Sequence, residues 1–121
     1  MKSPLKNKWV LITGASSGFG AAAARAFGAE GAKLLLGARR VERLKKVAAE
    51  SLRAGAAAAH AHELDVTKTA SVETFIAWAE SKIQAPAGLN VLINNAGGAH
   101  GQDSVAEGKD ADWETDRKSV V

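Results

Sequence analysis

The residue types best suited to chemistry lie in the segment Thr13-Gly14-Ala15-Ser16-Ser17-Gly18-Phe19-Gly20. An apolar run, residues 9–12, precedes it and an alanine-rich stretch, residues 21–27, follows it, so we expect a turn from a strand into a helix. Glycine lacks a Cβ atom, which lets the backbone turn tightly and approach a phosphate closely. The helix would direct its free N–H groups and the positive end of its dipole at that phosphate. The segment therefore predicts a binding site for the pyrophosphate of a dinucleotide.

A second candidate site follows the next apolar run, where the chain reads Gly37-Ala38-Arg39-Arg40 and has no carboxylate before Glu42. An acidic residue there would accept hydrogen bonds from a ribose 2′-hydroxyl and repel a 2′-phosphate. A guanidinium instead makes bidentate, charge-assisted contacts with phosphate. We therefore predict NADP(H), with Arg39 as the main 2′-phosphate ligand and Arg40 as the second. The alternative is two solvated arginines that precede a helix.

The elements that must position these residues alternate along the chain. We expect strands over residues 8–13, 33–37, 58–64 and 90–94, and helices over residues 18–30, 41–53 and 69–83, the last with Thr69 as its N-cap. The continuous apolar runs 34–36 and 91–93 are typical of parallel strands that are covered on both faces. The order predicts an α/β fold, a Rossmann-like parallel sheet with flanking helices and right-handed crossovers.

Three motifs together resemble the short-chain dehydrogenases/reductases. The segment from Thr13 to Gly20 matches their TGxxxGxG fingerprint, Asn94-Asn95-Ala96-Gly97 matches their NNAG motif, and Asp65-Val66 matches the acidic–apolar pair after their third strand. The intervals between the motifs also fit, so the resemblance covers roughly residues 6–114. It implies the N-terminal, cofactor-binding half of the family's domain, with about four strands of an incomplete sheet.

The resemblance implies a role for each motif in binding the cofactor. Asp65 would contact the adenine amine with Val66 beside the ring, the NNAG backbone would flank the cofactor, and Asn95 would tie neighbouring strands together. Simpler alternatives stay open: Asp65 as a turn cap, and Asn94 as an ordinary polar residue at a strand end. The expected cofactor-binding set is Gly14, Ser16, Ser17, Gly18, Phe19, Gly20, Arg39, Arg40, Asp65, Val66, Asn94, Ala96 and Gly97.

The chemistry implied by the family is hydride transfer between NADP(H) and a carbonyl or alcohol substrate. It uses a tyrosine as general acid and base, with a lysine four residues later, and this chain contains no tyrosine. We therefore assign no catalytic residue and expect the 121-residue chain alone to be inactive. The segments 18–20 and 94–115 look most like the NADP-dependent 3-hydroxy acid (serine-type) dehydrogenases. A stand-alone NADP-binding half-domain is the alternative, and another Rossmann-like enzyme such as a methyltransferase ranks third.

The last residues suggest that the domain is truncated. Residues 1–115 fit the family's cofactor-binding domain, whereas residues 116–121 (DRKSVV) abandon the pattern and match the translation of a common sequencing adapter. We expect a tail of non-native origin there. The strand at 90–94, central in the family's full sheet, would then lie at an edge, so self-association or aggregation is expected.

Composition argues against several other classes of protein. The chain has no cysteine, which excludes disulfides and fits a reducing, cytoplasmic location, and no apolar run approaches a membrane span. Residues 1–53 hold 11 Lys and Arg against 3 Asp and Glu, but no nucleic-acid-binding motif accompanies this basic half. His60, His62 and His100 lack the companions of a metal site, and we expect the first two to be exposed strand residues.

Overall fold

Strands and helices alternate along the described residues, 3–84 and 86–95 of a computed structural model. The strands are β1 (Trp9–Thr13), β2 (Lys33–Ala38), β3 (Ala58–Glu63) and β4 (Leu89–Asn94). The helices are α1 (Gly18–Ala29), α2 (Val41–Ala54) and α3 (Thr69–Lys82). All seven expected elements are present, and no end differs from the expected one by more than one residue.

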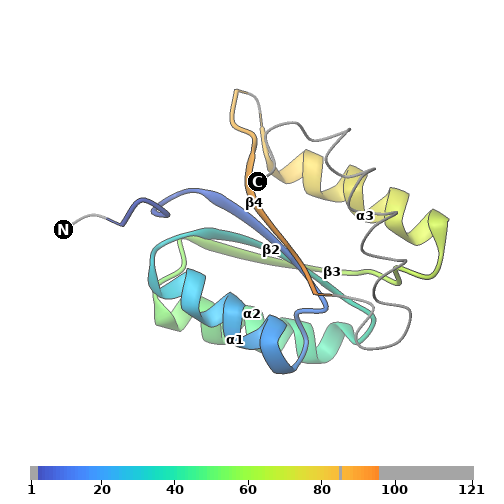
Figure 1. The fold of residues 1–121 in the computed structure, drawn as a ribbon, viewed down its shortest axis with the longest axis horizontal. Coiled ribbons are helices and arrows are strands. Elements are labelled where there is room, and N and C mark those ends of the chain that lie inside the picture. Colours follow the sequence, from blue (N-terminus) through green and yellow to red (C-terminus); the bar gives the residue numbers. More distant parts are fainter. Residues whose placement is uncertain (1–2, 85, 96–121) are drawn as a thin grey trace.

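The four strands form one parallel sheet in the order β3-β2-β1-β4. The chain moves outward from β1 through β2 to β3 and then crosses back to the other side of β1. Because crossovers between parallel strands are right-handed, this reversal places α3 on the face opposite to α1 and α2. Figure 1 shows that arrangement, with α1 and α2 below the sheet and α3 above it. The α/β Rossmann-like fold is confirmed.

Both faces of β1 and β2 are buried, as the apolar run 34–36 predicted, whereas the run 91–93 in β4 is only half-buried. Alternate residues along each strand point to opposite faces, so Val10, Ile12, Leu34 and Leu36 pack under α1 and α2. On the other face Leu11 and Leu35 pack with Phe75 and its neighbours on α3. Gly37 makes this second layer possible, because a Cβ there would lie 2.6 Å from the Phe75 ring.

Small residues let α1 lie close to its neighbours. The buried residues of α1 are all alanine or glycine: Gly20, Ala21, Ala23, Ala24 and Gly28. A Cβ at Gly28 would stand 2.9 Å from the Ser51 carbonyl oxygen of α2. The alanine-rich composition therefore reflects close packing between α1 and α2.

The pairing of β1 with β4 contains one irregularity that the sequence did not predict. Trp9 pairs with Leu89 and Val10 with Val91, so Asn90 is the extra residue between them. Its side-chain oxygen accepts a hydrogen bond from the Trp9 N–H at 2.9 Å. Within the described residues β4 is an edge strand, and Val91, Leu92 and Ile93 are only half-buried.

Two expectations about side chains were wrong. Thr69 is the first helical residue of α3, not its cap; Lys68 holds the N-cap position in extended conformation, without a side-chain capping bond. His60 and His62 are half-buried, not exposed, because α3 covers that face of β3. The His60 ring stacks on Trp9 at a centroid distance of 6.2 Å, and the His62 ring lies 4.9 Å from Trp78.

No described helix is long and apolar enough to cross a bilayer, since the longest have 14 residues and a span needs about 20. The described residues also contain no group of three or more His, Asp or Glu side chains that could hold a metal ion.

Candidate functional site

The candidate site lies at the edge of the sheet where the parallel strands end. The loop 14–17 leaves β1 at this edge, Arg39 follows β2, Asp65 follows β3 by two residues, and Asn95 follows β4. The chain leaves β1 toward β2 on one side and returns to β4 on the other, so the reversal point is beside β1. Open α/β sheets bind their ligands in the crevice at such a point.

The structure explains why glycine stands at positions 14, 18 and 20 of the loop after β1. Gly14 and Gly18 adopt φ values of 65° and 61°, which residues with a side chain rarely adopt. A Cβ at Gly20 would lie 2.2 Å from the Gly14 carbonyl oxygen, so only glycine lets α1 begin this close to the loop. A Cβ at Gly18 would meet nothing within 4 Å, so Gly18 borders open space at the start of α1.

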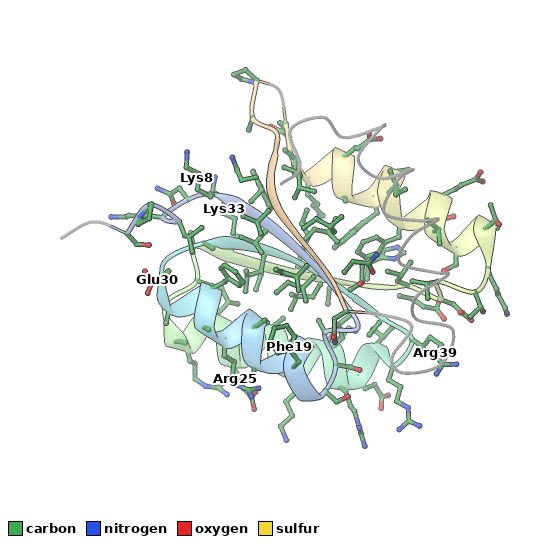
Figure 2. All side chains as sticks on the ribbon, viewed as in Figure 1. Lys8, Phe19, Arg25, Glu30, Lys33 and Arg39 are labelled. Atoms are coloured by element: carbon green, nitrogen blue, oxygen red, sulfur yellow. The ribbon has the colours of Figure 1, made fainter. Side chains whose placement is uncertain are left out.

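The N-terminus of α1 is suited to an anion. Ser17 is the N-cap in extended conformation, but its side chain makes no capping hydrogen bond, and the first turn contains no acidic residue. The first N–H groups of a helix have no partner within the helix and carry the positive end of its dipole. Phe19 in the same turn is 68% exposed and is labelled on α1 in Figure 2. The loop and helix start therefore fit a pyrophosphate.

Hydrogen bonds fasten this loop to the strands on both sides. The buried Thr13 hydroxyl donates to Asn94 Oδ1 and accepts from the Asn95 N–H, both at 3.0 Å. Asn95 Nδ2 donates to the Gly14 carbonyl oxygen at 3.2 Å, and the Ala15 N–H donates to the Gly37 carbonyl oxygen at 3.2 Å. Asn95 thus ties β4 to β1, as expected, and the loop geometry is set by the sheet.

The Asp65 carboxylate is held in one orientation by its own turn. Its Oδ1 accepts hydrogen bonds from the Thr67 N–H at 3.0 Å and the Thr67 hydroxyl at 2.6 Å, while its backbone N–H donates to Ser71 Oγ at 2.8 Å. The Thr67 hydroxyl and then the Thr67 N–H hold the pKa of Asp65 below its usual value, and Lys68 and Arg39 act in the same direction. Asp65 is therefore ionised and caps its turn through Oδ1. The second oxygen of its carboxylate, Oδ2, takes part in neither of these two bonds.

Both arginines after β2 are exposed. Arg39 lies beyond the strand end, as Figure 2 shows, and its charge acts on the Asp65 carboxyl. Arg40 is the N-cap residue of α2, where its carbonyl oxygen accepts a hydrogen bond from the Leu44 N–H. The nearest carboxylate along the chain is Glu42, in the first turn of α2. Two exposed arginines thus follow β2 at this corner of the site.

Most of the expected residues gather at this one edge of the sheet. The expected cofactor-binding set did not include Thr13, Thr67 and Ser71, whose hydrogen bonds hold the loops in place. The spacing Asp-x-Thr at 65–67 is typical of a side-chain-capped turn and could have indicated Thr67. Ala96, Gly97 and the tail at 116–121 lie outside the described residues.

Comparison with known proteins gives a consistent result. A family model described as short chain dehydrogenase matches residues 8–116. The 2,5-dichloro-2,5-cyclohexadiene-1,4-diol dehydrogenase LinX of Sphingobium indicum is 44% identical over 100 residues, 83% of this chain and 38% of LinX. The meso-2,3-butanediol dehydrogenase of Serratia marcescens is 41% identical over 107 residues, 88% of this chain and 40% of that enzyme. The chain thus spans about two fifths of the length of these relatives.

Solved structures share the fold. An alcohol dehydrogenase from Thermococcus sibiricus complexed with 5-hydroxy-NADP is 40% identical with a TM-score of 0.65, over 72% of this chain and 36% of that one. A metagenomic short-chain oxidoreductase in complex with NADP is 38% identical with a TM-score of 0.70, over 79% and 42%. An NADH-dependent reductase complexed with NAD is 32% identical with a TM-score of 0.71, over 81% and 39%.

Proposed function

The chain belongs to the short-chain dehydrogenase family, and from that premise we propose that it forms the NADP(H)-holding part of an oxidoreductase. The reaction class is hydride transfer between the nicotinamide ring and a carbonyl or alcohol carbon of the substrate. The cofactor supplies the hydride, whereas the protein binds and orients the reactants. In this proposal, the described residues bind the cofactor.

Each part of the site suits a different part of the cofactor. The loop from Gly14 to Gly20 would hold the pyrophosphate, with Ser16 and Ser17 offering hydroxyl or amide groups. Open space at Gly18 and the uncapped start of α1 support this assignment. Asp65 would accept a hydrogen bond from the adenine amine, with Val66 beside the ring. Asn94, Ala96 and Gly97 would flank the cofactor.

The observation that carries the choice of NADP(H) is Arg39 at the end of β2. Similar structures contain either NADP or NAD, so family membership alone does not decide between them. An exposed guanidinium directly after β2, with no carboxylate before Glu42, favours the cofactor that carries a 2′-phosphate. Arg40 would add a second positive charge.

For the substrate we propose a 3-hydroxy acid. The proposal rests on the likeness of residues 18–20 and 94–115 to the serine-type dehydrogenases. By their names, the two dehydrogenases described above act on diols, which are alcohols as 3-hydroxy acids are. Oxidation of such an alcohol needs a base close to its hydroxyl group.

We propose that the 121-residue chain binds the cofactor without turnover, because the tyrosine that serves as acid and base in the family is not among its residues. The same observation favours a second candidate function, a stand-alone NADP-binding half-domain. An assay of the chain with NADPH and a panel of carbonyl compounds distinguishes an active enzyme from these two non-catalytic possibilities. We expect NADPH oxidation, followed at 340 nm, to stay at the rate measured in buffer alone.

Exchange of Arg39 tests the proposed cofactor choice. Arg39→Asp should weaken NADPH binding by about tenfold or more while NADH binding improves, because a carboxylate repels the 2′-phosphate and accepts a bond from the 2′-hydroxyl. Arg53→Asp, at the far end of α2, is the matched control and should change neither affinity. An unchanged preference in Arg39→Asp would refute the assignment.

A further inference from the structure

A groove along the open side of β3 lies apart from the cofactor site. It is about 360 Å³ in volume, and β3 contributes its residues 59–61 to the floor. Lys45 and Leu52 of α2 line one side, and Trp78 and Lys82 of α3 line the other. Residues 59–61 belong to the beginning and middle of β3, whereas the cofactor site lies at the ends of the strands. The two sites are therefore separate.

The floor of the groove is the edge of a sheet. In the described part of the chain β3 pairs with β2 alone, in register from Ala58 to Glu63. The outer backbone groups of an edge strand can pair with a further strand, and many proteins bind extended peptides in this way. Helices α2 and α3 border this edge on either side, so an added strand would lie between two walls of side chains.

The walls of the groove carry apolar side chains, one of which is exposed among the described residues. Leu52 is 47% exposed and is one of two large apolar side chains that are exposed among the described residues. The other is Phe19, which lies in the cofactor loop. Across the groove stands the half-buried Trp78. Apolar side chains of a partner would be removed from water between Leu52 and Trp78.

The charges on the groove select the kind of partner. Within the described part of the chain, its lining residues include Lys45 and Lys82 and no carboxylate. Lys45 lies in the first half of α2 and Lys82 is the last residue of α3. Both helices connect parallel strands and so run opposite to them, which places the two lysines toward opposite ends of the groove. A complementary partner is apolar in the middle and acidic at both ends.

We propose that this groove binds an extended peptide segment, apolar at its centre and acidic at its ends, as an added strand beside β3. Main-chain hydrogen bonds to β3 would give the affinity, and the contacts with Leu52, Trp78 and the two lysines would give the specificity. The partner is thus a protein with an exposed acidic–apolar strand or tail.

Fluorescence anisotropy with a labelled peptide, acetyl-Glu-Glu-Val-Val-Val-Glu-Glu, tests the proposal on the full chain. We expect saturable binding that persists with saturating NADPH. Lys45→Glu combined with Lys82→Glu should weaken binding by about tenfold, since each reversed pair loses a surface contact and gains a repulsion. Leu52→Ser should weaken it as well. Lys46→Glu, a neighbouring lysine of α2 that does not line the groove, is the matched control and should leave binding unchanged.

Control peptides separate strand addition from simple charge attraction. A peptide with Lys in place of Glu should not bind, and one with Pro at the central position should bind weakly because proline cannot complete the strand pairing. The absence of saturable binding, equal losses in Lys46→Glu, or equal binding of the proline peptide would overturn the proposal. A second copy of this chain is the other possible occupant of the groove, and sedimentation of the double lysine variant tests for it. If the parent chain associates and binds no peptide, and the double variant is monomeric, the groove joins two copies instead. Circular dichroism checks that each variant is folded.

Discussion

At the scale of single residues, the loop after β1 assigns different tasks to glycines that look alike in the sequence. Gly20 is required by packing, because a Cβ there would overlap the Gly14 carbonyl group. Gly18 is required by its positive φ and borders open space instead. Substitution of Gly20 should therefore act mainly on stability, whereas substitution of Gly18 should have its larger effect on cofactor binding.

Substitution to alanine tests that separation. Gly20→Ala should lower the free energy of unfolding by about 1–3 kcal/mol, the range for overpacking. Gly18→Ala should cost about 1–2 kcal/mol through its left-handed backbone, with a larger effect on NADPH affinity because the new Cβ fills the space that a phosphate would approach. Urea unfolding and NADPH titration measure the two quantities. Ala22→Ser, exposed on the same helix, should change stability by less than about 0.5 kcal/mol. Equal stability of Gly20→Ala and the parent chain would contradict the packing role.

Asp65 and Thr67 provide a second prediction, which concerns pH. Thr67→Val removes the hydroxyl that bonds Oδ1, so the pKa of Asp65 should rise toward its usual value of 3.8. A lowered pKa contributes stability above the usual pKa, and that contribution disappears as the pH falls through the lowered value. The difference between Thr67→Val and the parent chain should therefore be constant above about pH 5 and shrink below it.

Carbon-detected NMR of the Asp65 carboxyl group follows this titration directly. Thr69→Val, at the exposed first residue of α3, is the matched control and should leave the Asp65 titration unchanged. An Asp65 pKa that does not respond to loss of the Thr67 hydroxyl would show that the turn does not hold the carboxylate.

At the scale of elements, β3 shows how a weak strand is stabilised by its surroundings. Its sequence, AAHAHE, contains no large aliphatic residue, yet it pairs with β2 along its whole length. Alanines 59 and 61 pack toward α2. On the α3 face the His60 ring stacks on Trp9, and the His62 ring lies tilted against Trp78. The aromatic contacts replace the aliphatic packing that the strand lacks.

The pKa of His60 leads to a prediction for the pH dependence of stability. Burial and, to a smaller extent, the charge of Lys82 lower the pKa of His60 from its ordinary value of 6.5. Because the unfolded chain then takes up the proton more readily, the stability associated with His60 is present above pH 6.5 and is lost as the pH falls through the lowered pKa. The free energy of unfolding should therefore fall between pH 7.5 and pH 5.

Comparison with His60→Gln isolates this contribution. The variant cannot take up the proton, so its urea midpoint should fall less between pH 7.5 and pH 5 than that of the parent chain. His62 remains in both proteins and cancels in the comparison. Parallel pH profiles of the two proteins would rule out His60 as the source.

Hydrophobic period and glycine placement were enough to predict the seven elements and the edge of the sheet at which the site gathers. The residues whose hydrogen bonds hold the loops of the site in place were not predictable in this way. The bulge at Asn90 and the bonds of Thr13 with Asn94 and Asn95 join segments about 80 residues apart, and their geometry exists only once β1 and β4 are paired. The burial of His60 likewise depends on α3 covering that face of β3.

At the scale of the whole molecule, β4 is the element that bears most on association with other copies of the chain. It is an edge strand in the described part of the chain, with Val91, Leu92 and Ile93 half-buried. An apolar edge strand is a template for pairing with another chain. We therefore expect the purified 121-residue chain to self-associate at micromolar concentration.

Sedimentation velocity over a concentration series measures this association. We expect the weight-average sedimentation coefficient to rise with concentration, and Leu92→Lys to reduce the rise because a charge on the edge strand opposes pairing. Lys46→Glu, on the exposed surface of α2, is the control and should behave as the parent chain does. A single monomeric species at every concentration would contradict the expectation.

The central claim concerns the molecule as a cofactor-binding unit, and parallel titration of the purified chain with NADPH and NADH tests it most directly. Quenching of tryptophan fluorescence or calorimetry gives both dissociation constants under identical conditions. The account predicts saturable binding of both cofactors with NADPH bound about tenfold or more tightly, since only NADPH offers the 2′-phosphate to Arg39 and Arg40. Equal affinities or a preference for NADH would contradict the role of Arg39, and the absence of binding by the folded chain would contradict the assignment of the site.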